Sequence, residues 1–121
     1  MIITSKILVM FIALEHFYIM IMEMFLWEKK GPSIFKQFNS NLFGQTTAMA
    51  KNMGIYNSFL AAGLTWSIFI NDSVWSFNIA VFFLLCVIVA GIYGGFTAEK
   101  SIFFKQGVPS IIVLIIIFLI K

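Results

Sequence analysis

Long apolar stretches separated by short polar links dominate this chain. A helix needs about 20 mostly apolar residues to cross a bilayer, and four stretches qualify: residues 5–27, 46–70, 74–95 and 98–120. The purely apolar run Ile111–Ile120 covers only about 15 Å at 1.5 Å per residue, so its helix should begin earlier, between Thr97 and Ser101. The pattern predicts an all-α integral membrane protein, a four-helix transmembrane bundle forming a single domain over residues 1–121.

The polar links carry signals for helix ends. Asn71-Asp72-Ser73 is short and rich in N-cap residues, so the second and third spans should form a tight antiparallel hairpin. Gly31-Pro32 is expected to terminate a helix. The mixed run Ser33–Phe38 after it is either a short amphipathic element in the membrane interface or a plain loop. Pro109 is expected to kink the fourth helix.

Composition excludes several classes of function. The chain is 61% hydrophobic and 11% charged, whereas soluble domains average about 25% charged residues. Its basic residues are all lysines that flank the apolar spans, so a nucleic-acid-binding surface is not expected. Cys86 is the single cysteine, which rules out an intrachain disulfide, and one Cys with one His does not complete a zinc site. We expect no metal and no cofactor, and the lipid bilayer is the first partner.

The lysines also predict an orientation. Six of the eight lie in or beside the first and third links, and only Lys6 and Lys121 lie at the opposite side. Cytoplasmic loops carry the excess of lysine, so these two links should be cytoplasmic and both termini outside. The N-terminus resembles a signal peptide, but no small-x-small site follows and Glu15-His16 interrupts the apolar run, so it is expected to remain as the first span.

Three ionisable residues lie inside the first span: Glu15, His16 and Glu23. Such groups are rare at membrane depth and usually face a bundle interior, a partner or water. His16 and Glu23 fall within about 20° of each other around a helix, and Glu15 lies about 80° from Glu23. This sector predicts a proton-linked or cation-linked site; the structural alternative is a polar network that fixes helix packing. The three could hold a hard metal only with ligands from other chains.

Further polar side chains are expected near Glu23, toward the cytoplasmic end of the bundle. They belong to Tyr56, Asn57, Tyr93 and Gln106. An amide at this depth needs a partner, and a hydrogen bond between Glu23 and Asn57 is our hypothesis. The alternative is that these are independent interfacial residues. The candidate ligand-binding or proton-linked residues are therefore Glu15, His16, Glu23, Tyr56, Asn57, Tyr93 and Gln106.

Small residues spaced four apart end the third span: Ala90 with Gly94, and Gly91 with Gly95. This spacing lets two helix backbones approach closely. Packing within one chain is favoured over dimerisation, and a homo-oligomer remains an alternative.

Several motifs together resemble a family of small bacterial membrane proteins catalogued as domain of unknown function thirteen-hundred-and-four. They are Leu14-Glu15-His16, Glu23–Trp27, Asn52–Asn57, Leu60–Leu64, Ala90–Gly94 and Gln106–Pro109, and they cover almost the whole chain. Met53 and Ser110 depart from the family pattern, which has glutamine and alanine there, but neither departure touches the acids or His16. The resemblance implies four spans and no established activity. We expect the protein to lie in the bacterial inner membrane.

Three functions follow as hypotheses. The leading one is binding or moving a small molecule or ion through the protonatable site, with Asn57 and Gln106 orienting the ligand. An intramembrane enzyme acting on a lipid or quinone headgroup would use a carboxyl group and His16 as acid and base. A non-catalytic scaffold subunit of a membrane complex would tolerate loss of the acids.

Overall fold

The computed structural model describes residues 1–121, and its elements are all helical. They are α1 (Ile3–Phe25), α2 (Trp27–Ile34), α3 (Asn41–Gln45), α4 (Thr47–Phe69), α5 (Ser73–Thr97), α6 (Lys100–Ile102), the π-helical turn η1 (Phe103–Gly107) and α7 (Val108–Leu119). The all-α fold expected from the sequence is confirmed.

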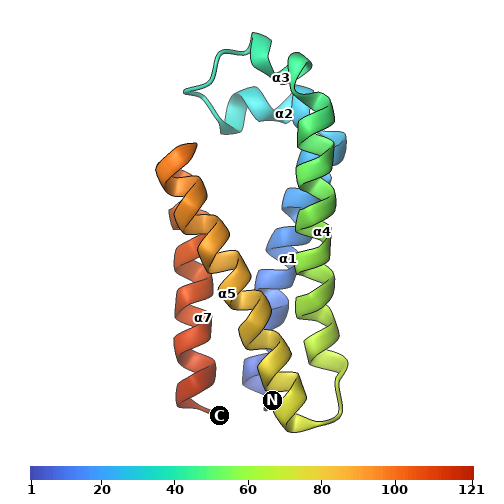
Figure 1. The fold of residues 1–121 in the computed structure, drawn as a ribbon, viewed down its shortest axis with the longest axis vertical. Coiled ribbons are helices and arrows are strands. Elements are labelled where there is room, and N and C mark those ends of the chain that lie inside the picture. The colour runs from blue at the N-terminus through green and yellow to red at the C-terminus, as the bar shows by residue number, and fades with distance from the viewer.

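The long helices stand side by side in two pairs (Figure 1). α1 packs against α4, and α5 packs against both α4 and the η1–α7 helix. Both chain ends and the link 70–72 lie at one end of the molecule, here called the terminal end. The α2–α3 segment and the α5–α6 turn lie at the other, here called the loop end (Figure 1).

An apolar core closes the terminal half of the bundle. All four long helices contribute to it, and its nine buried members are Val9, Ile12, Ala13, Leu64, Ala80, Leu84, Val87, Val113 and Ile117. Most of them come from the half of each helix nearer the terminal end.

The tight hairpin predicted at residues 71–73 is confirmed. α4 ends at Phe69 and α5 begins at Ser73. The Asp72 carboxylate accepts hydrogen bonds from the backbone N–H groups of Val74 and Trp75 at 3.0 and 2.9 Å. These are donors that a helix start leaves without an internal partner.

The last membrane helix begins at Lys100, within the range expected from its length, and continues to Leu119. The irregularity expected near Pro109 takes the form of a π turn, in which the Val108 N–H reaches the Phe103 carbonyl. Proline has no N–H to donate, and a wider turn before it is a common way to absorb that loss.

Gly31-Pro32 does not end a helix, which corrects the prediction. α2 runs through both residues to Ile34. In so short a helix Pro32 removes one backbone hydrogen bond, and Gly31 is buried against the ring of Phe43. The helical element therefore precedes most of the Ser33–Phe38 run, and Phe35–Phe38 lie beyond its end.

Three helical segments are long and apolar enough to cross a membrane: Ile3–Phe25, Ser73–Thr97 and Lys100–Leu119. α4 is also 23 residues long but is not among them, because its first half carries Lys51, Asn52 and Asn57. The chain is thus a helical membrane protein, and the fourth span is taken up below as a proposal.

Candidate functional site

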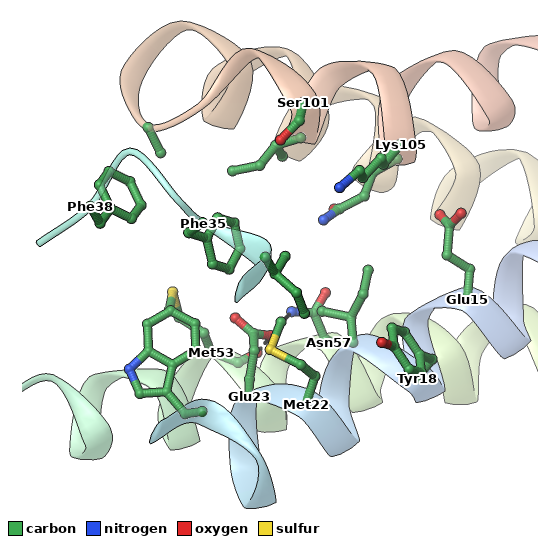
Figure 2. A pocket seen from close by; sticks show the side chains of 16 residues that line it. Glu15, Tyr18, Met22, Glu23, Phe35, Phe38, Met53, Asn57, Ser101 and Lys105 are labelled. Carbon is green, nitrogen blue, oxygen red and sulfur yellow. Dashed lines mark hydrogen bonds between the residues drawn. The ribbon is translucent and has the colours of Figure 1, made fainter. Parts of the chain in front are cut away.

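A cavity of about 560 Å³ lies at the loop end. α1 forms one wall, with part of α4, and α6 and η1 form the opposite wall (Figure 2). Its sixteen lining residues are Glu15, Tyr18, Ile19, Met22, Glu23, Trp27, Ile34, Phe35, Phe38, Met53, Asn57, Ala98, Ser101, Ile102, Lys105 and Gln106. Tyr18 and Lys105 are exposed members on opposite walls, which indicates that the cavity opens to the surroundings between them.

One face of α1 supplies both acids. Glu15, Tyr18, Met22 and Glu23 all line the cavity, and their spacing of three, four and eight residues is that of neighbours on a helix surface. At 1.5 Å per residue the Glu15 and Glu23 positions are about 12 Å apart along the axis. The cavity therefore has a carboxyl group toward each end of this wall (Figure 2).

Glu23 is hydrogen-bonded across the α1–α4 interface. Asn57 Nδ2 donates to Glu23 Oε1 at 2.5 Å and also to the Met53 carbonyl at 3.2 Å. The hydrogen bond hypothesised from the sequence is confirmed. Glu23 is 7% exposed, so Asn57 supplies a partner to a carboxyl group that is otherwise removed from water.

Gly54 allows this close approach. A Cβ atom there would lie 3.3 Å from the Met20 carbonyl oxygen and 3.4 Å from Glu23 Cβ, and would overlap the Met24 side chain. Any larger residue at position 54 would push α4 away from α1. Asn57, one turn further along α4, reaches Glu23 because Gly54 has no side chain.

A second close contact, between α5 and η1, positions the opposite wall of the cavity. A Cβ atom on Gly91 of α5 would lie 2.8 Å from the backbone nitrogen and 2.9 Å from the Cα of Gly107 in η1. The small residues predicted to permit close packing therefore do so within one chain. The contact fixes η1 against α5, and Lys105 and Gln106 of η1 line the cavity.

Aromatic rings cover the loop end of the cavity. The Trp27 ring packs tilted against Phe35 and Phe43, with centroids 5.7 and 5.1 Å away, and Phe35 stacks on Phe38 at 5.8 Å. Trp27 Nε1 donates to Thr46 Oγ1 at 3.0 Å, which anchors the ring. Figure 2 shows Phe35 and Phe38 on the side of the cavity nearer Glu23 than Glu15. We call Trp27, Phe35 and Phe38 the aromatic roof.

The roof is tied to the far wall as well. Gln37 Nε2 donates to the Ala98 carbonyl at 3.2 Å, between the segment after α2 and the end of α5. On the α4 side, Thr47 Oγ1 donates to Glu28 Oε1 at 2.8 Å. The α2–α3 segment therefore bridges the two helix pairs over the cavity.

His16 does not line the cavity. It is 0% exposed, and Nδ1 lies 2.9 Å from the Ile12 carbonyl oxygen. A carbonyl only accepts hydrogen bonds, so Nδ1 carries the proton and donates. Nε2 is buried without a hydrogen-bond partner. Glu15 and Glu23 share the cavity, but the imidazole expected beside them faces the interior of the bundle.

Tyr56 and Tyr93 are not brought to the site. Their exposed fractions are 65% and 69%, and neither lines the cavity. Both lie at the loop end of their helices, as expected, but they point outward. Asn57 and Gln106 are the residues outside α1 that were predicted from sequence and do line it.

Neither acid forms an ion pair with a basic side chain of the protein. Asn57 is the side-chain partner of Glu23, and Oε1 of Glu15 is buried without a partner. Glu15 is half-buried and Glu23 is buried. A carboxyl group removed from water without a basic partner is stabilised by a proton or by a bound cation.

Sequence reasoning missed the aromatic roof, Tyr18, Met22 and Lys105. Tyr18 and Met22 lie three and seven residues after Glu15, on the same side of a helix. If Glu15 rather than His16 had been taken as the residue that faces the cavity, this spacing would have predicted both. Phe35 and Phe38 lie in an irregular segment whose position depends on how α2 folds back over the bundle, and no local pattern indicates that.

Comparison with known proteins matches almost the whole chain. The family model described as "Protein of unknown function (DUF1304)" matches residues 10–118. The uncharacterized protein YpaA of Lactococcus lactis subsp. lactis (strain IL1403) is 34% identical over 117 residues, which cover 95% of this chain and 97% of that protein. No solved structure matches. The resemblance noted from the sequence motifs is thereby confirmed, and the chain belongs to the DUF1304 family of proteins of unknown function.

Proposed function

We propose that this protein binds a small organic molecule in the cavity at the loop end, through the carboxyl groups of Glu15 and Glu23. The observation that carries the proposal is that two carboxyl groups without basic partners line one cavity of about 560 Å³. Small-molecule sites are typically apolar concavities of about 300–1,000 Å³ with a few converging polar groups. A bare ion would need far less space.

The terminal half of the bundle is filled by the apolar core, which supports entry of a ligand from the loop end alone. The nine-residue apolar core lies between the cavity and the terminal end of the bundle. Movement of a ligand across the membrane therefore requires a second arrangement in which this core opens. Binding is the part of the hypothesis that the geometry supports best, and transport is an extension of it.

The proposed setting is a bacterial inner membrane with four spans. α4 runs beside α1 over most of its length (Figure 1). If α1 crosses the membrane, α4 therefore crosses it too and forms the fourth span. The lysines cluster at the loop end, which favours that end in the cytoplasm and both termini outside. The cavity would then open near the cytoplasmic face.

The enzyme alternative has less support. An enzyme of this kind would need a carboxyl group and His16 as acid and base in one cavity. His16 is buried and does not line the cavity, so it would not reach a substrate there. The scaffold alternative leaves the unpartnered Glu15 oxygen without a role.

Native mass spectrometry of the purified protein tests the proposal. Glu23→Gln keeps an oxygen that can accept from Asn57 and removes the charge. Glu28→Gln is the matched control, because Glu28 does not line the cavity and glutamine keeps an oxygen that can accept the hydrogen bond from Thr47. We expect a bound small molecule in the wild type and in Glu28→Gln and its loss in Glu23→Gln. The same occupancy in both variants would contradict the proposal.

A further inference from the structure

The cavity has an electrostatic polarity that points to a class of ligand. Its lining carries two carboxyl groups, Glu15 and Glu23, and one ammonium group, Lys105. The other polar lining residues are neutral. With all three ionised the lining has one negative charge in excess, which a monovalent cation would balance.

Of the two acids, Glu23 is the one at the aromatic end of the cavity. Figure 2 shows Phe35 on the Glu23 side of the cavity and Lys105 on the wall opposite both acids. Glu23 lies about 12 Å from Glu15 along α1 at 1.5 Å per residue, and its side-chain partner is the neutral amide of Asn57. A ligand cation bound at the aromatic end would therefore find its counter-charge in Glu23.

Aromatic surface surrounds this same end. Trp27, Phe35 and Phe38 line the cavity, and their rings pack in series with centroid separations of 5.7 and 5.8 Å. None of the protein's own cations lies over these rings, since the lysine–ring contacts involve Lys121 with Phe77 and Phe118. Ring faces attract organic cations within about 6 Å of their centroids. A carboxyl group beside aromatic faces is the environment that an onium group prefers.

We propose that the ligand is a lipophilic organic cation, an amine or quaternary onium, with its charged group beside Glu23 and the aromatic roof. This deepens the proposed function and rests on it. The apolar substituents extend along Met22 and Ile19 toward Glu15. A small inorganic cation would leave this apolar surface uncovered, and an anion would meet the excess negative charge.

Tetraphenylphosphonium and tetraphenylborate are suitable probes, because they have nearly the same size and shape and opposite charges. Binding of tritiated tetraphenylphosphonium to the immobilised full-length protein is measured by scintillation proximity. Binding of tetraphenylborate is measured in a separate experiment by equilibrium dialysis, because the two ions together form a sparingly soluble salt. We expect the cation to bind, with its affinity reduced about tenfold or more in Glu23→Gln and unchanged in Glu28→Gln. A tenfold change corresponds to about 1.4 kcal/mol.

The aromatic contribution is tested at Phe35, which is only partly buried. Phe35→Leu removes the ring and keeps an apolar side chain, and Phe35→Tyr keeps a ring. We expect a loss of about two- to fivefold for leucine, the scale of one exposed cation–ring contact, and little change for tyrosine.

Three results would overturn the organic-cation assignment: no binding of tetraphenylphosphonium, binding insensitive to Glu23→Gln, or equal binding of tetraphenylborate. The proposed function is judged separately, by the co-purified small molecule in native mass spectrometry. A co-purified neutral or anionic molecule that depends on Glu23 would keep the proposed function and reject the cation.

Discussion

Asn57 of α4 and Glu23 of α1 are joined by a hydrogen bond of 2.5 Å across the interface between the two helices. The bond lies at the wall of the cavity, so it both orients a candidate ligand-binding carboxyl group and holds the helix pair together. A double-mutant cycle with Glu23→Ala and Asn57→Ala should give a coupling free energy of unfolding of about 1 kcal/mol, within the range of hydrogen bonds in membrane proteins. Equilibrium unfolding in detergent measures it, and additive effects would show that the bond contributes nothing.

The contact between Gly91 and Gly107 should be sensitive to a single methyl group. In Gly91→Ala the new Cβ would meet backbone atoms of Gly107 at 2.8 and 2.9 Å. Backbone cannot move aside like a side-chain end, so we expect a destabilisation of about 1–3 kcal/mol.

Gly44→Ala is the control for that substitution, because nothing lies within 4 Å of a Cβ at position 44. Alanine in a helix is favoured over glycine by about 0.5–1 kcal/mol, so this variant should be neutral or more stable. Thermal unfolding of both variants in the same detergent compares them. Equal effects would contradict the close approach of α5 and η1.

The bond between Gln37 and the Ala98 carbonyl should restrain the aromatic roof. Gln37→Leu removes the donor from an exposed position, and one such bond contributes about 1 kcal/mol. Hydrogen exchange of the amides in residues 35–38 should become a few-fold faster, with α4 unchanged, because local opening depends on local contacts. Unchanged exchange in residues 35–38 would mean that this bond does not hold the roof.

The proposed topology predicts opposite accessibility of two links. In a Cys86→Ser background, Asn71→Cys at the terminal end should react with a membrane-impermeant thiol reagent on intact cells. Ser40→Cys at the loop end should react only after the membrane is opened. The two positions flank α4, so labelling of both on intact cells would contradict a fourth span, and the reverse pattern would contradict the orientation.

The parts of the fold that follow local rules could be predicted from the sequence. Asp72 caps a helix in any context, and the ten apolar residues at the end of the chain are too few to span a membrane, which required an earlier start near Lys100. The Glu23–Asn57 bond could be anticipated because both residues enter the membrane from the same end and each needs a partner.

Other features depend on tertiary packing. Glu15 and His16 are adjacent, so they point about 100° apart on α1, and sequence alone did not show which of them faces the cavity. Pro32 reads locally as a helix stop, but Gly31 packed under Phe43 keeps α2 helical beyond it. Phe35 reaches the cavity only because α2 turns back over the bundle.

The central claim, that a ligand occupies this cavity, is tested most directly by filling the cavity without touching either acid. Ser101 lines the wall opposite α1, and Ser101→Trp would place an indole in the cavity. Ser40→Trp, at an exposed position outside it, is the control. Native mass spectrometry should show the bound molecule in the wild type and in Ser40→Trp and its loss in Ser101→Trp. Full occupancy by the same molecule in Ser101→Trp would place the ligand elsewhere and contradict the account.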